Sequence, residues 1–274
     1  MLLQAAELSF GYDADVVLHD VTVAVPRGGI VGILGPNGSG KTTLLRLLAG
    51  TLKPTRGRVR FDEGDLAALP RLAIARRLAV VPQEVHLAFE YTALEIALMG
   101  RYPHLGPFEL EGPDDVEIAR RALLATGTLG LEHRPFDTLS GGEKQRVIIA
   151  SALAQFEPAA RAGAGSPPAA QALLLDEPTA SLDMHYEVEV AGLLRRLNLE
   201  RGLTIVVSTH DLNFAAALCK QLVLLREGRV LAAGPTGAVL TAERIRELYG
   251  VDADVRYHEI AGHLTVVPLP RRVQ

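Results

Sequence analysis

The sequence predicts an α/β fold built around a mostly parallel β-sheet. Two short apolar runs, residues 29–34 and 203–208, are rich in Ile and Val, and a third, residues 172–175, is rich in Leu. Continuous apolarity of this length is typical of strands buried on both faces of a parallel sheet. A segment with helical spacing of apolar residues follows each run, and the alternation of strand and helix predicts a doubly wound core.

The middle of the chain predicts helices instead. The three core helices are expected at residues 41–50, 184–198 and 211–221, whereas residues 92–154 carry helical patterns and few strand signals. Thr92 and Glu95 have the spacing of a capping box, which marks the start of a helix. We therefore expect a helical subdomain at about residues 86–158, inserted into the α/β core.

Two further segments differ from the core. Residues 156–171 are rich in Ala, Gly and Pro without periodicity, which predicts a mobile surface loop. After Gly250, two alternating apolar runs flank a glycine-bearing turn, which predicts a hairpin. The expected organisation is one core domain, residues 1–250, and a short tail, residues 251–274.

Composition limits the classes of partner. The 274 residues carry a formal net charge of −4, which gives no electrostatic case for a nucleic-acid surface. Cys219 is the only cysteine, so no internal disulfide forms, and we expect it to be a small apolar residue on a helix. Neither a secretory signal nor an apolar run of about 18 residues is present in this sequence, so membrane contact is expected through a partner.

The segment "GPNGSGKTT" predicts a nucleotide-binding loop. It follows the apolar run 29–34, precedes a predicted helix and matches the pattern G-x-x-x-x-G-K-[ST] in that context. Glycines allow backbone N–H groups to surround a phosphate at the helix N-terminus. Lys41 is expected to reach the β and γ oxygens of ATP, and Thr42 to bind Mg²⁺. The fold class is thus predicted as the core of a P-loop nucleoside triphosphatase.

Two carboxylates end the apolar run in "ALLLDEP". Asp176 at the strand tip is expected to hold Mg²⁺, and Glu177 to activate a water that attacks the γ-phosphate. A solvated acidic pair at a strand end is the alternative interpretation.

The segment "LSGGE" combines a capping box with two glycines. Ser140 and Glu143 have the spacing that starts a helix, but adjacent glycines are costly in a first turn. They suggest that a ligand approaches the backbone closely, and a helix N-terminus of this kind is an anion site.

Taken in order, these motifs resemble the ATP-binding subunits of ABC transporters. The resemblance rests on "GPNGSGKT", "VVPQ", "LSGGE", "LLLDEP", "SLD" and "STH", and it covers nearly the whole chain. It implies an antiparallel β edge beside the core and an ATP hydrolase coupled to transport.

The resemblance also implies roles for single residues. Tyr12 would stack on adenine, Gln83 would sense Mg²⁺ and the attacking water, and His210 would contact the γ-phosphate. Asp183 would lie in the loop that communicates across a dimer. Without the resemblance, the local sequence would predict Tyr12 to be an aromatic residue at a strand edge and His210 to be a residue at the start of a helix. The residues expected to bind ATP are Tyr12, Gly35, Pro36, Asn37, Gly38, Ser39, Gly40, Lys41, Thr42, Thr43, Ser140, Gly141, Gly142 and Asp183; Glu177, His210 and Gln83 are expected to be catalytic, and Thr42, Gln83 and Asp176 to bind the metal.

The resemblance further implies a homodimer in which each "LSGGE" segment completes the ATP site of the other subunit. A membrane permease dimer and, indirectly, a substrate-binding protein would be the other partners, at the cytoplasmic face of the inner membrane. Residues 84–107 are expected to line the permease contact. Within them, His86 and His104 are expected to be surface residues rather than metal ligands.

The transported substrate is open at this level. The segment "ALMGRYPHLG" and the short tail resemble the subfamily that serves iron-complex, haem and cobalamin importers, and the insertion before "LLLDEP" resembles haem-importer ATPases. Haem is therefore the expected substrate, with ferric siderophore or cobalamin as the alternatives. A soluble ABC ATPase acting on DNA or ribosomes is a remote alternative, because the chain has neither a long coiled-coil insert nor a second cassette.

Overall fold

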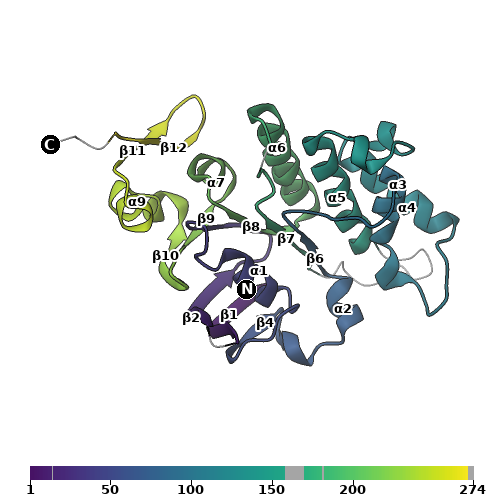
Figure 1. Cartoon of the computed structure of the whole chain (residues 1–274), viewed down its shortest axis with the longest axis horizontal. Coiled ribbons are helices and arrows are strands. Elements are labelled where there is room, and N and C mark those ends of the chain that lie inside the picture. Colours follow the sequence, from purple (N-terminus) through teal and green to yellow (C-terminus); the bar gives the residue numbers. More distant parts are fainter. Residues whose placement is uncertain (14, 158–169, 181, 271–274) are drawn as a thin grey trace.

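The computed structural model describes residues 1–13, 15–157, 170–180 and 182–270. Within them, the central sheet has the strand order β10-β9-β3-β8-β7-β6 (Figure 1). Its strands are β3 (Ile30–Leu34), β6 (Leu78–Val81), β7 (Ala172–Asp176), β8 (Thr204–Thr209), β9 (Gln221–Arg226) and β10 (Arg229–Pro235). All neighbours pair in parallel except β10, which is antiparallel to β9. The mostly parallel core is therefore confirmed.

A second, antiparallel sheet lies against one side of this core. Its order is β2-β1-β4-β5, formed by β1 (Leu3–Tyr12), β2 (Asp15–Val25), β4 (Arg56–Phe61) and β5 (Gly64–Asp65). Figure 1 shows this sheet beneath the central one, with α1 (Lys41–Leu48) close to both. The expected antiparallel β edge is thus confirmed.

The continuous apolarity of the central strands follows from burial on both faces. In β3, Val31 and Ile33 belong to the apolar cluster shared with α1 and the antiparallel sheet, whereas Ile30 and Leu34 belong to the cluster on the helical side. Successive strand residues point to opposite faces, so a strand covered on both sides needs no polar position. The helices on the other side are α5 (Gly141–Phe156), α6 (Met184–Arg201) and α7 (Leu212–Leu218).

The inserted helices lie between β6 and β7 in the chain. They are α3 (Ala93–Met99), α4 (Pro113–Ala125) and α5, which pack against one another beside the sheet (Figure 1). The predicted capping box starts α3: Thr92 N–H donates to Glu95 at 2.7 Å, and Glu95 N–H donates to the Thr92 hydroxyl at 3.3 Å. The short helix α2 (Arg71–Ala75) precedes β6. Most of the predicted loop 156–171, residues 158–169, lies outside the described residues.

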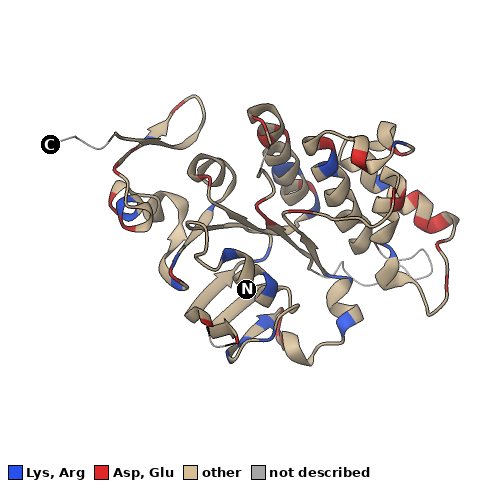
Figure 2. Cartoon of the chain, viewed as in Figure 1, with Lys and Arg blue, Asp and Glu red and all other residues tan. Residues whose placement is uncertain are grey.

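A fully buried arginine holds the inserted helices together. Arg101, after α3, donates through Nε to the Asp115 carboxylate of α4 at 2.9 Å. Its Nη1 donates to the carbonyl oxygens of Ala154 and Glu157, both at 2.6 Å. Figure 2 shows the acidic first turn of α4 to which Asp115 belongs. One side chain therefore ties α3, α4 and the end of α5.

The C-terminal elements pack back on the core. They are α8 (Thr236–Val239), α9 (Ala242–Tyr249), and the antiparallel pair β11 (Ala253–His258) and β12 (His263–Pro268). Cys219 is buried, as expected, but α7 ends just before it, short of the predicted residue 221. The reason is that Lys220 N–H donates to the Ile30 carbonyl at 3.1 Å, which brings the chain into the sheet.

Candidate active site

The carboxyl ends of three neighbouring strands build the site. Leu34 of β3 pairs with Thr209 of β8, and Ser208 of β8 pairs with Asp176 of β7. The segments that begin with Gly35, Glu177 and His210 therefore start at one edge of the sheet. In open α/β sheets, ligands bind in the crevice at this edge.

The loop between β3 and α1 needs its glycines. A Cβ atom on Gly35 would lie 2.2 Å from the Leu225 carbonyl oxygen, and one on Gly40 would lie 2.7 Å from Leu18 Cδ2. Gly40 also has φ 99°, a left-handed value that favours glycine. The loop can follow this path only with glycine at both positions.

The same loop lines a cavity of about 520 Å³. Gly40 caps α1 without a side-chain hydrogen bond, and Ser39 Oγ is buried without a hydrogen-bond partner among the described residues. The open N–H groups at the start of α1 fit a bound phosphate, whereas Ser39 Oγ lies against Gly35 and does not line the cavity. The residues lining this cavity are Val17, Asn37, Gly38, Gly40, Lys41, Thr42, Thr43, Gln83 and Glu177.

The Glu177 carboxylate lies between the side chains of Lys41 and His210. Its Oε1 is 3.3 Å from Lys41 Nζ, and its Oε2 is 3.2 Å from His210 Nδ1. Lys41 is only 5% exposed, and its Nζ also donates to the carbonyl oxygens of Gly35 at 2.9 Å and Pro36 at 3.2 Å. The structure thus brings together three residues that the sequence predicts for the γ-phosphate region.

The backbone of Glu177 explains how its side chain reaches the cavity. Its φ is 45°, in the left-handed region that a non-glycine residue seldom adopts. Its N–H donates to the Ser208 carbonyl at 3.0 Å, which fixes this turn at the end of β7. Asp176, one residue earlier, stays buried and accepts a hydrogen bond from the Ser208 hydroxyl. The two adjacent carboxylates therefore have different surroundings.

The predicted metal residues share a second cavity. Thr42, Gln83 and Asp176 all line a space of about 270 Å³. A hydroxyl, an amide oxygen and one carboxylate are a donor set that suits Mg²⁺, which is bound through one or two carboxylates together with substrate phosphates. No group of three or more His, Cys, Asp or Glu side chains that could hold a metal ion occurs among the described residues.

The Ser140 segment forms the start of α5, the last of the inserted helices. The capping box is present, with Glu143 N–H donating to Ser140 Oγ at 3.3 Å and Ser140 N–H donating to Glu143 at 2.8 Å. Hydrogen bonds from Ser140 lower the pKa of Glu143. None of the residues lining the 520 Å³ cavity comes from this segment.

The two glycines there have different surroundings. A Cβ atom on Gly142 would lie 2.3 Å from the Tyr186 ring of α6, whereas one on Gly141 would meet only Leu182 Cδ2, at 3.1 Å. Packing against Tyr186 of the same chain is therefore enough to explain why glycine is required at position 142. Gly141 is exposed and remains available to a ligand.

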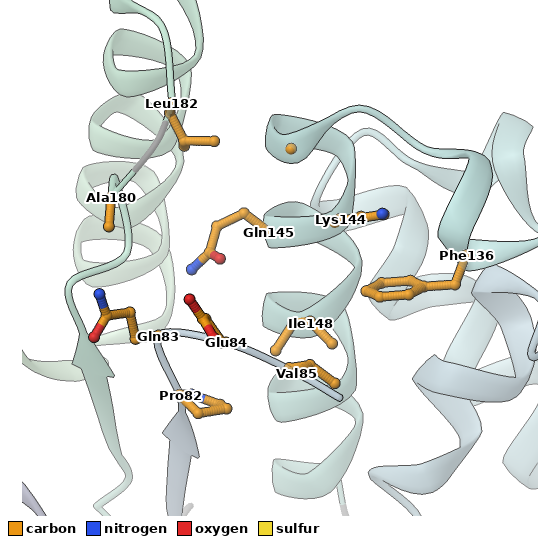
Figure 3. A pocket seen from close by; sticks show the side chains of 11 residues that line it. Pro82, Gln83, Glu84, Val85, Phe136, Lys144, Gln145, Ile148, Ala180 and Leu182 are labelled. Carbon is orange, nitrogen blue, oxygen red and sulfur yellow. The ribbon is translucent and has the colours of Figure 1, made fainter. Parts of the chain in front are cut away.

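Figure 3 shows a third cavity, between β6 and α5, of about 280 Å³. Gln83, Glu84 and Gln145 point toward it. Gln145 is absent from the sequence predictions, although its signal is present: Gly141, Gln145 and Ile148 follow the i, i+4, i+7 spacing of one helix face.

Two other predicted site residues, Tyr12 and Asp183, lie outside the nucleotide cavity. Tyr12 ends β1, is 43% exposed and packs edge to face on Phe10 with ring centroids 4.9 Å apart. Asp183 caps α6 by accepting from Tyr186 N–H at 3.2 Å. The structure places neither residue on the 520 Å³ cavity.

The two histidines of residues 84–107 differ. His86 is exposed beside Glu84, as expected for a surface residue. His104 is less exposed than expected: its ring is half-buried, with Nε2 2.8 Å from the Gln155 carbonyl oxygen, and burial lowers its pKa. In the described part of the chain, no helix is long and apolar enough to cross a membrane.

Comparison with known proteins gives consistent matches. The family model described as "ABC transporter" matches residues 18–180. The chain is 39% identical to a hemin import ATP-binding protein, HmuV, of Bordetella pertussis, covering 97% of this chain and 99% of the relative. It is 36% identical to a ferric enterobactin transport ATP-binding protein, FepC, of Escherichia coli, covering 98% and 94%.

A further relative is longer than this chain. The cobalamin import ATP-binding protein BtuD of Halobacterium salinarum is 40% identical over 93% of this chain, which spans 61% of that relative. Among solved structures, an inward-facing one described as a metal-chelate type ABC transporter has a TM-score of 0.83 at 29% identity, with 98% of each chain covered. The dimeric ABC transporter cassette MJ0796 has a TM-score of 0.71 at 28% identity, covering 85% and 98%.

Proposed function

The chain belongs to the ABC transporter family, as an ATP-binding subunit, and from this premise we propose that it hydrolyses ATP to power the uptake of haem through a membrane permease. The observation that carries the proposed activity is the placement of Glu177 between Lys41 and His210 at the glycine-rich loop. The haem relatives, matched over nearly their full length, support the choice of substrate. Ferric siderophore and cobalamin are the alternatives that the other relatives suggest.

ATP binds with its phosphates on the glycine-rich loop. The uncapped N–H groups at the start of α1 donate to phosphate oxygens, the loop that includes Ser39 surrounds them, and Lys41 reaches the β and γ oxygens. Tyr12 stacks on the adenine ring from the end of β1, because its exposed face is free to receive a base. The remaining ATP-binding residues are Gly35, Pro36, Asn37, Gly38, Gly40, Thr42 and Thr43.

Thr42, Gln83 and Asp176 would hold Mg²⁺, since all three face one cavity and can supply oxygen ligands. When bound, Mg²⁺ neutralises charge on the β- and γ-phosphate oxygens. Ser208 orients the Asp176 carboxylate through its hydroxyl.

Hydrolysis uses Glu177 as the general base. Glu177 takes a proton from water as the water oxygen bonds to the γ-phosphorus and the bond to the bridging oxygen of ADP breaks. His210 holds the γ-phosphate and, through its 3.2 Å contact, the Glu177 side chain. Lys41 stabilises the charge that develops on the phosphoryl oxygens.

The Ser140 segment acts on the ATP of a second copy of the chain. None of its residues lines the nucleotide cavity of its own chain, which supports this arrangement, as does the similarity to a dimeric cassette. A two-fold dimer brings each helix N-terminus, with Ser140 and Gly141, to the partner's phosphates. Asp183, which caps α6, lies in the loop that we assign to communication across this dimer.

A permease segment docks at the cavity between β6 and α5. Gln83 lines all three cavities described above: this one, the nucleotide cavity and the proposed metal cavity. Its position can therefore link the permease to the metal and the γ-phosphate. The exposed Phe89 and Tyr102 of residues 84–107 extend the contact, whereas Arg101 between them is internal. The subunit then sits at the cytoplasmic face of the inner membrane, and a substrate-binding protein acts on it through the permease.

Reconstitution tests the proposal. The subunit is placed in vesicles with the permease encoded beside it, and ATP hydrolysis is measured with the binding protein loaded with haem, a ferric siderophore or cobalamin. We expect stimulation by the haem-loaded protein. Stimulation only by the binding protein loaded with another cargo would show that this cargo, and not haem, is the substrate. Hydrolysis that does not respond to the permease would contradict the transport role.

A further inference from the structure

The C-terminal elements pack beside the helix that follows His210. Figure 1 shows α9 and the β11–β12 hairpin next to α7. Val266 of β12 and Ala253 of β11 are buried in the same apolar cluster as Phe214 of α7. The hairpin is therefore part of the main core on this side.

A side-chain amide joins α7 to the hairpin. Asn213, in the first turn of α7, accepts from Val266 N–H at 2.8 Å and donates to the Val266 carbonyl at 3.2 Å. The amide thus pairs with both backbone groups of one strand residue, as a neighbouring strand would. This double contact fixes the start of α7 three residues after His210.

A tyrosine makes a second contact with the same segment. The hydroxyl of Tyr249, the last residue of α9, points to the backbone carbonyl of His210 at 3.4 Å, a long and weak hydrogen bond for an O–H donor. Burial, followed by the negative charges of Asp211 and Glu177, raises the pKa of Tyr249 to about 12. The phenol therefore stays protonated and able to donate at neutral pH.

The C-terminal elements are themselves held together. Leu269 N–H donates to the Asp252 carbonyl at 2.8 Å, and Arg246 of α9 forms an ion pair with Asp252. Hence α9 and the hairpin can act on the His210 segment as one unit.

We propose that Tyr249 and Asn213 are positioning residues that use the C-terminal helix and hairpin to hold His210 at the γ-phosphate. The His210 side chain is 56% exposed, and its contact with Glu177 does not hold the backbone that carries it. Thr209 in β8 and the Asp211 cap of α7 hold the residues on either side of His210. The two C-terminal contacts add to that restraint, one at the His210 carbonyl and one at the start of α7. This inference rests on the proposed role of His210 in hydrolysis.

The test begins with Tyr249→Phe, which removes only the hydroxyl. Loss of one hydrogen bond is expected to lower kcat about three- to ten-fold while the KM for ATP stays within about two-fold. Tyr257→Phe, the same change at an exposed tyrosine of β11, is the matched control and should leave kcat unchanged. Asn213→Ala opens the other contact and should lower kcat further.

A double-mutant cycle separates positioning from general stability. In the His210→Ala background, Tyr249→Phe should have no further effect on kcat, because both changes then act through the same side chain. Melting temperatures of the four proteins show whether any loss comes from unfolding.

The outcomes distinguish the two proposals. If His210→Ala retains full activity, the proposed catalytic role of His210 fails. If His210→Ala lowers kcat to a rate that can still be measured, but Tyr249→Phe and Asn213→Ala both turn over like the unmodified protein, the positioning role alone is overturned. The same holds if Tyr249→Phe lowers kcat by the same factor in both backgrounds.

Discussion

Lys41 Nζ and Glu177 Oε1 lie 3.3 Å apart, joining the start of α1 to the end of β7. The contact places the proposed base beside the proposed phosphate-binding cation, and Glu177 is only 11% exposed there. Its other oxygen faces His210 at 3.2 Å. A water that attacks the γ-phosphate would therefore meet Glu177 in a nearly enclosed position.

Glu177→Gln should abolish turnover without abolishing ATP binding. The amide keeps the shape and hydrogen bonds of the side chain but cannot accept a proton from water, so kcat should fall about 100-fold or more. ATP-bound dimers should accumulate and be visible by size-exclusion chromatography. Glu200→Gln, the same change on the exposed surface of α6, is the control. A hydrolysis rate unchanged in Glu177→Gln would contradict the assignment of the base.

Gly141→Asp should prevent closure of the dimer and leave the monomer intact. A carboxylate at the first position of α5 suits the helix itself but repels the phosphates of the ATP held by the partner subunit. The Leu182 side chain, at 3.1 Å from the new Cβ, can move. ATP binding by the monomer, measured by calorimetry, should be retained, whereas ATP-induced dimers and hydrolysis should be lost.

The neighbouring glycine provides the comparison. Gly142→Ala should lower the melting temperature even without ATP, because its methyl group would meet the Tyr186 ring at 2.3 Å. If monomeric Gly141→Asp failed to bind ATP, the Ser140 segment would have to act within its own chain.

Asp115→Asn should destabilise the inserted helices. It removes the carboxylate that faces the fully buried Arg101, and breaking such a pair costs about 3 kcal/mol of the free energy of unfolding. Asp114→Asn, at an exposed neighbour, is the control. Urea unfolding followed by circular dichroism measures both, and equal stabilities of the two variants would contradict the role of Arg101.

The same pair predicts a pH dependence. Burial acts to raise the pKa of Asp115, but the hydrogen bonds from Arg101 and Gly112 and the Arg101 charge outweigh it, so the pKa is lowered. The stability from Asp115 is then fully present above the carboxyl's unfolded-state pKa and is lost as the pH falls through the lower folded-state pKa. The difference between the unmodified protein and Asp115→Asn should accordingly shrink in acid.

Cys219 should be unreactive in the folded protein. The thiol is buried, and burial raises its pKa to about 12, so almost no thiolate exists at pH 8. A chromogenic disulfide reagent should label it only after denaturation in urea. Rapid labelling of the native protein would show that the end of α7 opens readily.

Local patterns predicted much of the fold. The apolar runs mark β3, β7 and β8 because both faces of each are covered, and the capping boxes at Thr92 and Ser140 start α3 and α5 as expected. These features depend on residues that are close in the sequence.

What the sequence could not reveal depends on distant contacts. The burial of Arg101 requires the carbonyl oxygens at the end of α5, and the crowding at Gly142 requires Tyr186 of α6. In the same way, the half-buried state of His104 comes from Gln155. Periodicity and motif spacing carry no information about such pairs.

The left-handed backbone at Glu177 opposes the stability of the fold. A side chain at φ 45° costs roughly 1–2 kcal/mol relative to the right-handed region, and glycine would avoid that cost. A Glu177→Gly protein would avoid that cost, but it would also lose the base and the carboxylate that faces the buried Lys41. The backbone cost and the Lys41 contact therefore act in opposite directions at the one residue that we assign as the base.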